Sequence, residues 1–344
     1  MDIDLILEPN LAPAKIAALG LLAEEKGFRA IWAQNYSSAR DAFMSLVPLA
    51  QQSRRIKIGV VIVCPYEMHP MKITNAVLTL NEFSNGRAMV VIGSGGEWPE
   101  VMQSATFYTG YGKRKSNVRE TLQIVKQAIK NKEINYTGEH YSALRFSTRW
   151  HSESPPTIYH GACGPIMLKL GASMADGVMM SDVMPAMFAD RLPVVSKGVA
   201  QRPDRQNFRI SNFVAWHVRE DKAQSLAEAR RELIIRGWLE KEWLEPFLDE
   251  DDVKLVLKNR WPFLKAWIEG HGNIEGIPAH ITDTLVTELS LTGDYNDLDR
   301  NIERLQEFAT AGFTEIALRI HETPEESIRL IGDRVLPELA GCLA

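Results

Sequence analysis

Short apolar stretches alternate with amphipathic helical stretches along most of the chain, and this alternation limits its fold more than any other feature. Eight stretches have the composition of strands, and nearly every one is followed by a helical stretch. A strand–helix–strand unit places its two strands parallel, so eight such units predict a closed (β/α)8 barrel, the TIM barrel. A doubly wound open sheet is the alternative architecture.

Local signals set the expected boundaries. Residues 56–63 are β-branched and nearly continuous, which is typical of a strand buried on both faces of a parallel sheet. Pro13 and Pro70 each stand where a first helical turn begins. The expected strands are residues 2–8, 29–33, 56–63, 88–92, 157–160, 177–180, 208–217 and 315–318. The expected helices are residues 13–26, 41–53, 70–83, 114–130, 165–174, 185–200, 297–311 and 324–339.

One stretch interrupts the alternation after the seventh strand. Residues 219–290 contain no convincing strand, and 237–270 is amphipathic at helical spacing. The stretch holds half of the chain's eight tryptophans, namely Trp238, Trp243, Trp261 and Trp267. These rings either fill the core of a helical insertion or form an aromatic lid over a planar ligand.

The chain length is consistent with a barrel that carries this insertion. A barrel takes roughly 250 residues, and the chain has 344. We therefore expect one TIM-barrel domain over residues 1–344, with a helical insertion at about 219–290 that acts as a lid or supports a dimer.

Composition and charge exclude several classes of protein. The net charge of −5 argues against a nucleic-acid partner, and no run of about 18 apolar residues predicts a membrane span. The acidic start Met1–Asp4 lacks the positive charge of a signal peptide. Cys64, Cys163 and Cys342 are spaced too widely for a disulfide framework or a zinc site. We expect a cytoplasmic protein without a metal.

The carboxyl ends of the strands are where a TIM barrel carries its chemistry. In the first strand the apolar residues Ile3, Leu5 and Leu7 occupy odd positions and should pack outward against the helices. Glu8 then points into the mouth of the barrel, where a carboxylate with a raised pKa serves as a general acid or base. The alternative is a rim carboxylate paired with a neighbouring Lys or Arg.

Two glycine-containing loops follow strands and offer backbone N–H groups. Residues 93–96, Gly-Ser-Gly-Gly, can approach a phosphate or a ring edge closely, but Trp98 stands where a dinucleotide fingerprint needs its third glycine. Residues 161–165, Gly-Ala-Cys-Gly-Pro, join a strand to a helix whose first turn begins at Pro165, and such a helix N-terminus is a ready anion site. A simple tight turn is the alternative for either loop.

Three stretches of the chain resemble the bacterial luciferase-like superfamily of flavin and deazaflavin oxidoreductases. They are residues 65–70 (Pro-Tyr-Glu-Met-His-Pro) with 78–88, residues 92–96 (Ile-Gly-Ser-Gly-Gly), and residues 156–169 with Ala175-Asp176-Gly177. The third stretch and the Glu8-Pro9-Asn10 region most resemble the F-420-dependent methylene-tetrahydromethanopterin reductase family. The likeness covers most of the chain outside about 219–290.

The resemblance implies a TIM barrel that assembles as a homodimer or tetramer and holds a flavin-type ring at its C-terminal face. In the deazaflavin branch, a non-proline cis peptide at the end of strand three backs the ring, and this bond aligns with Val61–Ile62. The 161–165 loop then holds the phosphate or tail of the cofactor. The residues implied in cofactor binding are Val61, Ile62, Cys64, Gly93, Ser94, Gly95, Gly161, Cys163, Gly164 and Pro165.

The chain departs from the family pattern at two places. Ile6 stands where the reductase carries its active-site glutamate, and Glu8 faces the same side two residues later. Asn35-Tyr36 stands where the family often has Asp-His, although Tyr36 can still donate a hydrogen bond to a carbonyl or imine. We expect Glu8, Asn35 and Tyr36 to polarise the substrate or transfer a proton.

The expected activity is hydride transfer between coenzyme F-420, the deazaflavin, and a small organic substrate. A methylene-tetrahydropterin-like carrier of one-carbon groups is one candidate substrate. The alternatives are an FMN-dependent monooxygenase of the same superfamily and a non-catalytic barrel that binds flavin.

Overall fold

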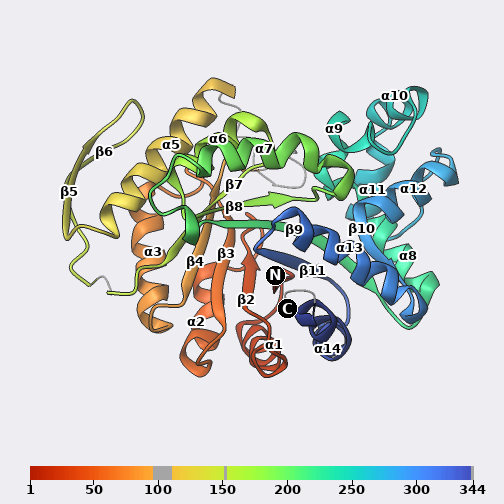
Figure 1. The fold of residues 1–344 in the computed structure, drawn as a ribbon, viewed down its shortest axis with the longest axis horizontal. Coiled ribbons are helices and arrows are strands. Elements are labelled where there is room, and N and C mark those ends of the chain that lie inside the picture. Colours follow the sequence, from red (N-terminus) through yellow and green to blue (C-terminus); the bar gives the residue numbers. More distant parts are fainter. Residues whose placement is uncertain (96–110, 151–152, 342–344) are drawn as a thin grey trace.

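The computed structural model describes residues 1–95, 111–150 and 153–341 and shows a closed barrel of eight parallel strands (Figure 1). Around the barrel the order is β1, β2, β3, β4, β7, β8, β9 and β11, and β11 pairs with β1 to close the ring. The predicted TIM barrel is therefore confirmed. Its strands are β1 (Asp2–Leu7), β2 (Ala30–Gln34), β3 (Lys57–Val63), β4 (Ala88–Gly93), β7 (Thr157–Gly161), β8 (Gly177–Ser181), β9 (Arg209–Val218) and β11 (Glu315–Ile320).

Helices cover the outside of the barrel, and most begin and end within three residues of the positions expected from the sequence. They are α1 (Pro13–Lys26), α2 (Ala42–Gln52), α3 (Pro70–Phe83), α5 (Tyr111–Ala128), α6 (Pro165–Met174), α7 (Phe188–Val199) and α13 (Leu298–Ala311). The last segment contains α14 (Pro324–Leu330), a π-helical turn (Ile331–Val335) and α15 (Leu336–Gly341). Among the described helices, none has the length and apolar character needed to span a membrane.

The alternation of side chains along β1 follows the predicted pattern. Ile3, Leu5 and Leu7 belong to the large core between strands and helices, whereas Ile6 packs inside the barrel. Side chains from several barrel strands fill this small inner core. Its members are Ile6, Ala30, Trp32, Val61, Met89, Val91, Tyr159, Met179 and Ala317.

Charged groups occupy one end of the barrel interior, at the N-terminal ends of the strands. The fully buried Asp4 carboxylate accepts hydrogen bonds from Arg29 Nε and from Trp32 Nε1, each at 2.8 Å. Glu315, also fully buried, lies 3.5 Å from the Arg29 guanidinium and accepts from the Tyr159 hydroxyl at 2.7 Å. Because these residues come from β1, β7, β11 and the start of β2, the cluster ties the closing strands together.

The stretch after β9 is a helical insertion, as expected, but it ends in a short strand that the sequence pattern did not predict. Residues 290–293 form β10 (Ser290–Gly293), which pairs with the extension of β9 beyond β8. Four residues are too short to show a two-residue period. The insertion contains α8 (Lys222–Arg231), two 3-10 turns (Leu233–Ile235 and Gly237–Leu239), α9 (Lys241–Leu244), α10 (Glu250–Lys258), α11 (Trp261–Glu269) and α12 (Ala279–Leu289).

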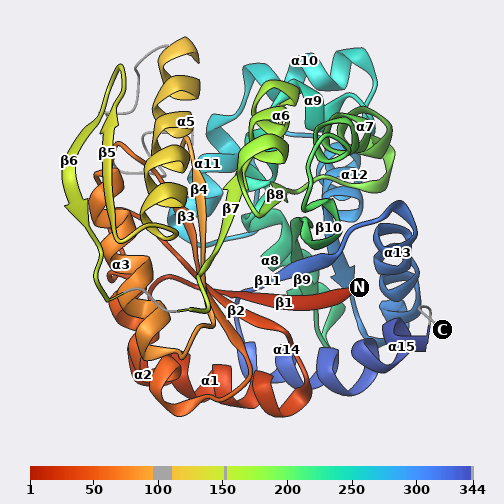
Figure 2. The same ribbon diagram turned by 60° about the vertical axis from the view of Figure 1, so that its left-hand side comes forward.

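A second feature was also not expected from the sequence. Strands β5 (Glu133–Thr137) and β6 (Ser142–Ser147) form an antiparallel hairpin beside α5 (Figures 1 and 2). In Figure 1 this hairpin and the helices α9 to α12 of the insertion lie at opposite sides of the molecule. The hairpin follows α5 and precedes β7, so it is a second elaboration of the barrel. Both elaborations lengthen the chain without adding a barrel strand.

We predict that Asp4→Ala destabilises the protein by about 3–5 kcal/mol, because it leaves the Arg29 charge partly buried beside fewer partners. Urea unfolding followed by circular dichroism measures the loss. The matched control is Asp2→Ala at the same end of the barrel, where the side chain is 48% exposed and its ion pairs contribute about 1 kcal/mol or less. Equal losses in the two variants would contradict the buried-cluster account.

Candidate functional site

A cavity of about 620 Å³ opens at the C-terminal ends of the barrel strands. Its floor is apolar and consists of side chains that rise from the barrel interior, namely Ile6, Val61, Met179 and Phe213. Its walls come from the loops after β2, β3, β4, β7 and β8 and from the insertion. A largely apolar cleft of this size with a few polar groups is typical of a cofactor or small-molecule site.

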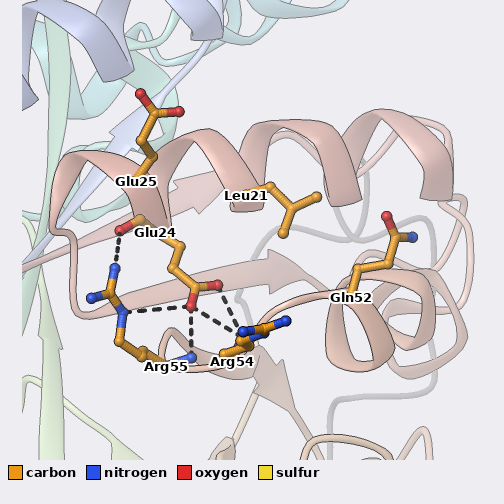
Figure 3. Close-up of a pocket in the computed structure, with 6 residues that line it drawn as sticks. All are labelled: Leu21, Glu24, Glu25, Gln52, Arg54 and Arg55. Atoms are coloured by element: carbon orange, nitrogen blue, oxygen red, sulfur yellow. Dashed lines mark hydrogen bonds and ion pairs between the residues drawn. The ribbon is translucent and has the colours of Figure 1, made fainter.

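A second hollow lies between α1 and the loop after α2, at the N-terminal end of the strands (Figure 3). There the Glu24 carboxylate accepts hydrogen bonds from the backbone N–H groups of Arg54, at 3.1 Å, and Arg55, at 2.7 Å. The charge of Glu24 thus holds the loop that leads into β3. The hollow is far from the strand ends that carry chemistry in this fold.

Asn35, which follows β2, makes hydrogen bonds to the part of the cavity wall formed by the end of β3 and the loop after it. The peptide bond between Val61 and Ile62 is cis, as the family resemblance implies, and both residues line the cavity. The Asn35 side-chain amide donates to the Ile62 carbonyl at 3.2 Å and to the Glu67 carboxylate at 2.9 Å. Both N–H bonds of this amide are therefore used, and Oδ1 is the group of the side chain that is left to accept a hydrogen bond.

Glu67 was not selected as a site residue from the sequence, although it lies in the 65–70 stretch that carries the resemblance. It lines the cavity, and its partial removal from solvent raises the pKa of the carboxyl. A carboxyl group with a raised pKa in a cleft is a candidate proton carrier. The signal in the sequence was its place in the loop that follows a buried strand, four residues after Val63.

Tyr36 lines the cavity, whereas Cys64 does not. Burial raises the pKa of the Tyr36 hydroxyl, so the phenol stays protonated at neutral pH and can donate a hydrogen bond. Cys64 is buried in a small cluster with Tyr36 and Tyr66, and burial raises the pKa of its thiol to about 12. The structure therefore places Cys64 behind the cavity wall rather than at its surface.

Glu8 sits at the barrel mouth, but it does not line the cavity. Its Oε1 lies 2.9 Å from His321 Nδ1 and accepts a hydrogen bond from Arg319 Nη2 at 3.3 Å. Burial lowers the pKa of His321 well below its ordinary value, which favours the neutral imidazole beside Glu8. Arg319, at the end of β11, does line the cavity. The alternative interpretation from the sequence, a carboxylate paired with a neighbouring basic residue, describes this geometry.

The loop between β7 and α6 forms another wall through Gly161, Cys163, Gly164 and Pro165. The Ser181 backbone N–H donates to Cys163 Sγ at 3.3 Å, and burial raises the pKa of this thiol to about 12, so it is not a thiolate nucleophile. Gly164 is the N-cap of α6 and supplies no side-chain cap. The first-turn N–H groups of α6 consequently stand available to an anion.

The loop after β4 reaches the cavity through Ser94 and Gly95. Gly93 does not line the cavity; it lies beneath the wall, where a Cβ would come 2.8 Å from Ile62 Cγ2 and 3.3 Å from the Gly161 carbonyl oxygen. A glycine is thus required for the close approach of β3, β4 and β7. Gly96 and Trp98 lie outside the described residues.

The four tryptophans of the insertion have different places. Trp238 and Trp243 line the cavity, Trp267 packs against the main core, and Trp261 is 62% exposed. Trp238 and Trp243 thus belong both to the cavity lining and to the packing of the main core, and the role of the insertion as a lid stays a prediction. The amphipathic stretch 237–270 is divided among three helices and the turn at Gly237–Leu239.

Within the described residues, one group of three side chains has the spacing of metal ligands, namely Glu120, Glu139 and His140. It lies at the β5–β6 hairpin, away from the cavity. The Glu120 carboxylate accepts hydrogen bonds from the backbone N–H groups of Glu139, His140 and Tyr141 at 2.8–3.0 Å. These hydrogen bonds explain why the Glu120 carboxylate lies at the turn of the hairpin, which it holds in place.

Comparisons with known proteins agree with this architecture. The luciferase-like monooxygenase family model matches residues 5–315, insertion included. The 5,10-methylenetetrahydromethanopterin reductase of Archaeoglobus fulgidus is 29% identical over 323 residues, which cover 92% of this chain and 93% of that protein.

Solved structures resemble the fold over nearly the whole chain. The coenzyme F-420-dependent tetrahydromethanopterin reductase of Methanopyrus kandleri matches with a TM-score of 0.81 at 21% identity, covering 98% of this chain and 100% of that one. An F-420-dependent secondary alcohol dehydrogenase, in complex with an F-420–acetone adduct, matches with a TM-score of 0.77 at 16% identity, covering 98% and 99%. Because the family model matches most of its residues, the chain belongs to the luciferase-like monooxygenase family.

Proposed function

We propose that this protein is an oxidoreductase that transfers hydride between coenzyme F-420 and a small organic substrate. The observation that carries the proposal is the cavity at the C-terminal face, which combines an apolar floor, the Val61–Ile62 wall and an uncapped helix N-terminus. The F-420-dependent relatives among the comparisons support the choice of cofactor. A pterin-like one-carbon carrier, the substrate named for the reductases, is one candidate substrate.

The residues of the cavity fit such a cofactor. A Cβ on Gly164 would meet no atom within 4 Å, so space is open beside the free N–H groups of α6, as a phosphate needs. The apolar side chains of Val61, Ile62 and Met179 line the cavity and offer apolar contacts to a ring system. Cys163, Pro165, Ser94 and Gly95 lie around the same space.

The bound deazaflavin would supply the carbon that accepts or donates the hydride. The protein's own residues position the reactants and exclude water. The apolar floor keeps solvent from the reacting face, since its side chains seal the barrel interior below. Asn35 accepts a hydrogen bond through its Oδ1, because its two N–H bonds are already committed to Ile62 and Glu67.

Two further residues face the substrate space. Tyr36 keeps its proton, because burial raises its pKa, and it donates a hydrogen bond to a substrate carbonyl or imine. The Arg319 guanidinium, held by Glu8, presents a fixed positive charge to the cavity. Glu8 thus acts as a positioning residue through Arg319, and Glu67 supplies a carboxyl group at the cavity surface beside Asn35.

We predict that the protein binds F-420 with a micromolar Kd and does not bind FMN tightly. Titration of each cofactor, followed by absorbance and by the fluorescence of F-420, measures both affinities. Tight FMN binding together with oxygen consumption would instead establish the flavin monooxygenase alternative. Binding of neither cofactor would favour a barrel without this activity.

We predict that Glu8→Gln lowers kcat/KM about tenfold, which corresponds to about 1.4 kcal/mol of lost transition-state stabilisation. The amide keeps the shape of the side chain but removes the charge that holds Arg319. Steady-state assays at saturating F-420 measure the effect, and the Kd of F-420 should stay within twofold of wild type. Glu25→Gln, on the distant hollow of Figure 3, is the control. Unchanged turnover in Glu8→Gln would remove Glu8 from the site.

A further inference from the structure

The turn Gly237–Leu239 brings an unusual backbone conformation to the cavity. Its three residues all have positive φ, at 50° for Gly237, 57° for Trp238 and 49° for Leu239. Residues with a Cβ rarely adopt this left-handed region, because the Cβ crowds the following carbonyl oxygen. Two consecutive residues persist in this conformation only where the surrounding structure holds them in place. Strained backbone of this kind is found mainly at ligand and active sites.

A buried anchor on the barrel holds the turn. Asp182, which follows β8, is fully buried and itself left-handed at φ 52°. Its carboxylate accepts hydrogen bonds from Arg236 Nη1 at 2.7 Å and from the Gly237 backbone N–H at 3.1 Å. Its backbone carbonyl accepts from Trp243 Nε1 at 2.9 Å. One barrel residue therefore fixes both ends of the cavity-lining segment.

Packing inside the segment leaves little freedom. A Cβ on Gly237 would lie 2.2 Å from the Trp243 ring, so the backbone of the turn rests directly on that indole. Leu239 is fully buried, whereas Trp238 between them is half-buried and lines the cavity. The turn thus directs one aromatic ring to the ligand space from a rigid support.

The charged residues that follow the turn are paired with groups outside the cavity lining. Glu240 accepts from Arg260 at 2.7 Å, and Glu242 accepts from Arg191 at 3.1 Å. Lys241 forms an ion pair with Glu245 at 3.1 Å. Each of these charges has a partner in the insertion or, for Glu242, on α7, which leaves the Trp238 indole as the group that this turn offers to a ligand.

We propose that Trp238 is a specificity-determining residue that contacts the substrate, and that Asp182 is the positioning residue that holds it there. This inference rests on the proposed oxidoreductase function. The residues that fit the cofactor come from β3, the loop after β4, the β7–α6 loop and β8, so the insertion faces the remaining space. An indole face favours a substrate with a flat conjugated ring over a compact aliphatic one.

Kinetics of the full-length protein test the proposal with F-420 at saturation. The two probe substrates are 5,10-methylenetetrahydromethanopterin, which carries a flat ring, and acetone, which is compact. We expect Trp238→Ala to raise KM for the ring-bearing substrate at least tenfold, with kcat changed less than threefold and the Kd of F-420 within twofold. Asp182→Asn should raise the same KM, although Asp182 does not line the cavity. Trp261→Ala, at the exposed first position of α11, is the matched control and should leave every constant unchanged.

A binding readout distinguishes this inference from the proposed function. In protein labelled with 5-fluorotryptophan, the ¹⁹F resonance of Trp238 is assigned from Trp238→Phe and followed while each probe is added. We expect methylenetetrahydromethanopterin to shift it and the Trp261 resonance to stay in place. The fluorescence of F-420 reports separately on whether the cofactor binds. If F-420 does not bind, the proposed function fails, and the probe titration alone still decides the role of Trp238.

Three results would overturn the inference. A Trp238 resonance that neither probe shifts would show that the ring does not contact the substrate. A loss of F-420 affinity in Trp238→Ala as large as the rise in KM would assign the ring to the cofactor instead. A shift with acetone alone would exclude the flat-ring class of substrate.

Discussion

The pairing of β1 with β11 places the first and last strands of the barrel side by side, and the composition of the site depends on this closure. It brings Glu8 into contact with Arg319, which lies 311 positions away in the chain. At the other end of the same strands, the buried cluster of Asp4, Arg29 and Glu315 fixes their register. A slip of one residue would exchange the inward and outward side chains of β1 and remove Ile6 from the cavity floor.

The pattern of apolar residues explains why the sequence predicted so much of the fold. Strands and helices with apolar residues at regular spacing, such as residues 56–63 and 70–83, were placed within a residue of their positions. Most of the residues expected to bind a cofactor line the cavity, because the carboxyl ends of parallel strands meet at one face. The strand β10 was not predicted, because four residues are too few to show a two-residue period of apolar side chains. It also depends on pairing with the extended end of β9.

The chemistry of individual side chains was harder to predict than their location. Glu8 is at the mouth as expected, yet its carboxylate is directed to Arg319 and His321, and these contacts join residues from opposite ends of the chain. Asn35 became an acceptor because the Ile62 carbonyl and Glu67 occupy its N–H groups. The anchor between Asp182 and Arg236 spans 54 positions, so no local pattern could indicate it. Hydrogen-bond partners that are distant in the sequence determine which donor or acceptor each polar group still has for a ligand.

The central claim is that F-420 occupies the C-terminal cavity with its ring against Val61 and Ile62. A crystal structure of the full-length protein with F-420 tests this claim most directly. Our account predicts ring density beside the Val61–Ile62 wall and phosphate density at the N-terminus of α6 near Gly164. It also predicts an open space between the ring and Trp238. Ring density at any other part of the protein, or a cavity that stays empty at saturating F-420, would contradict the account.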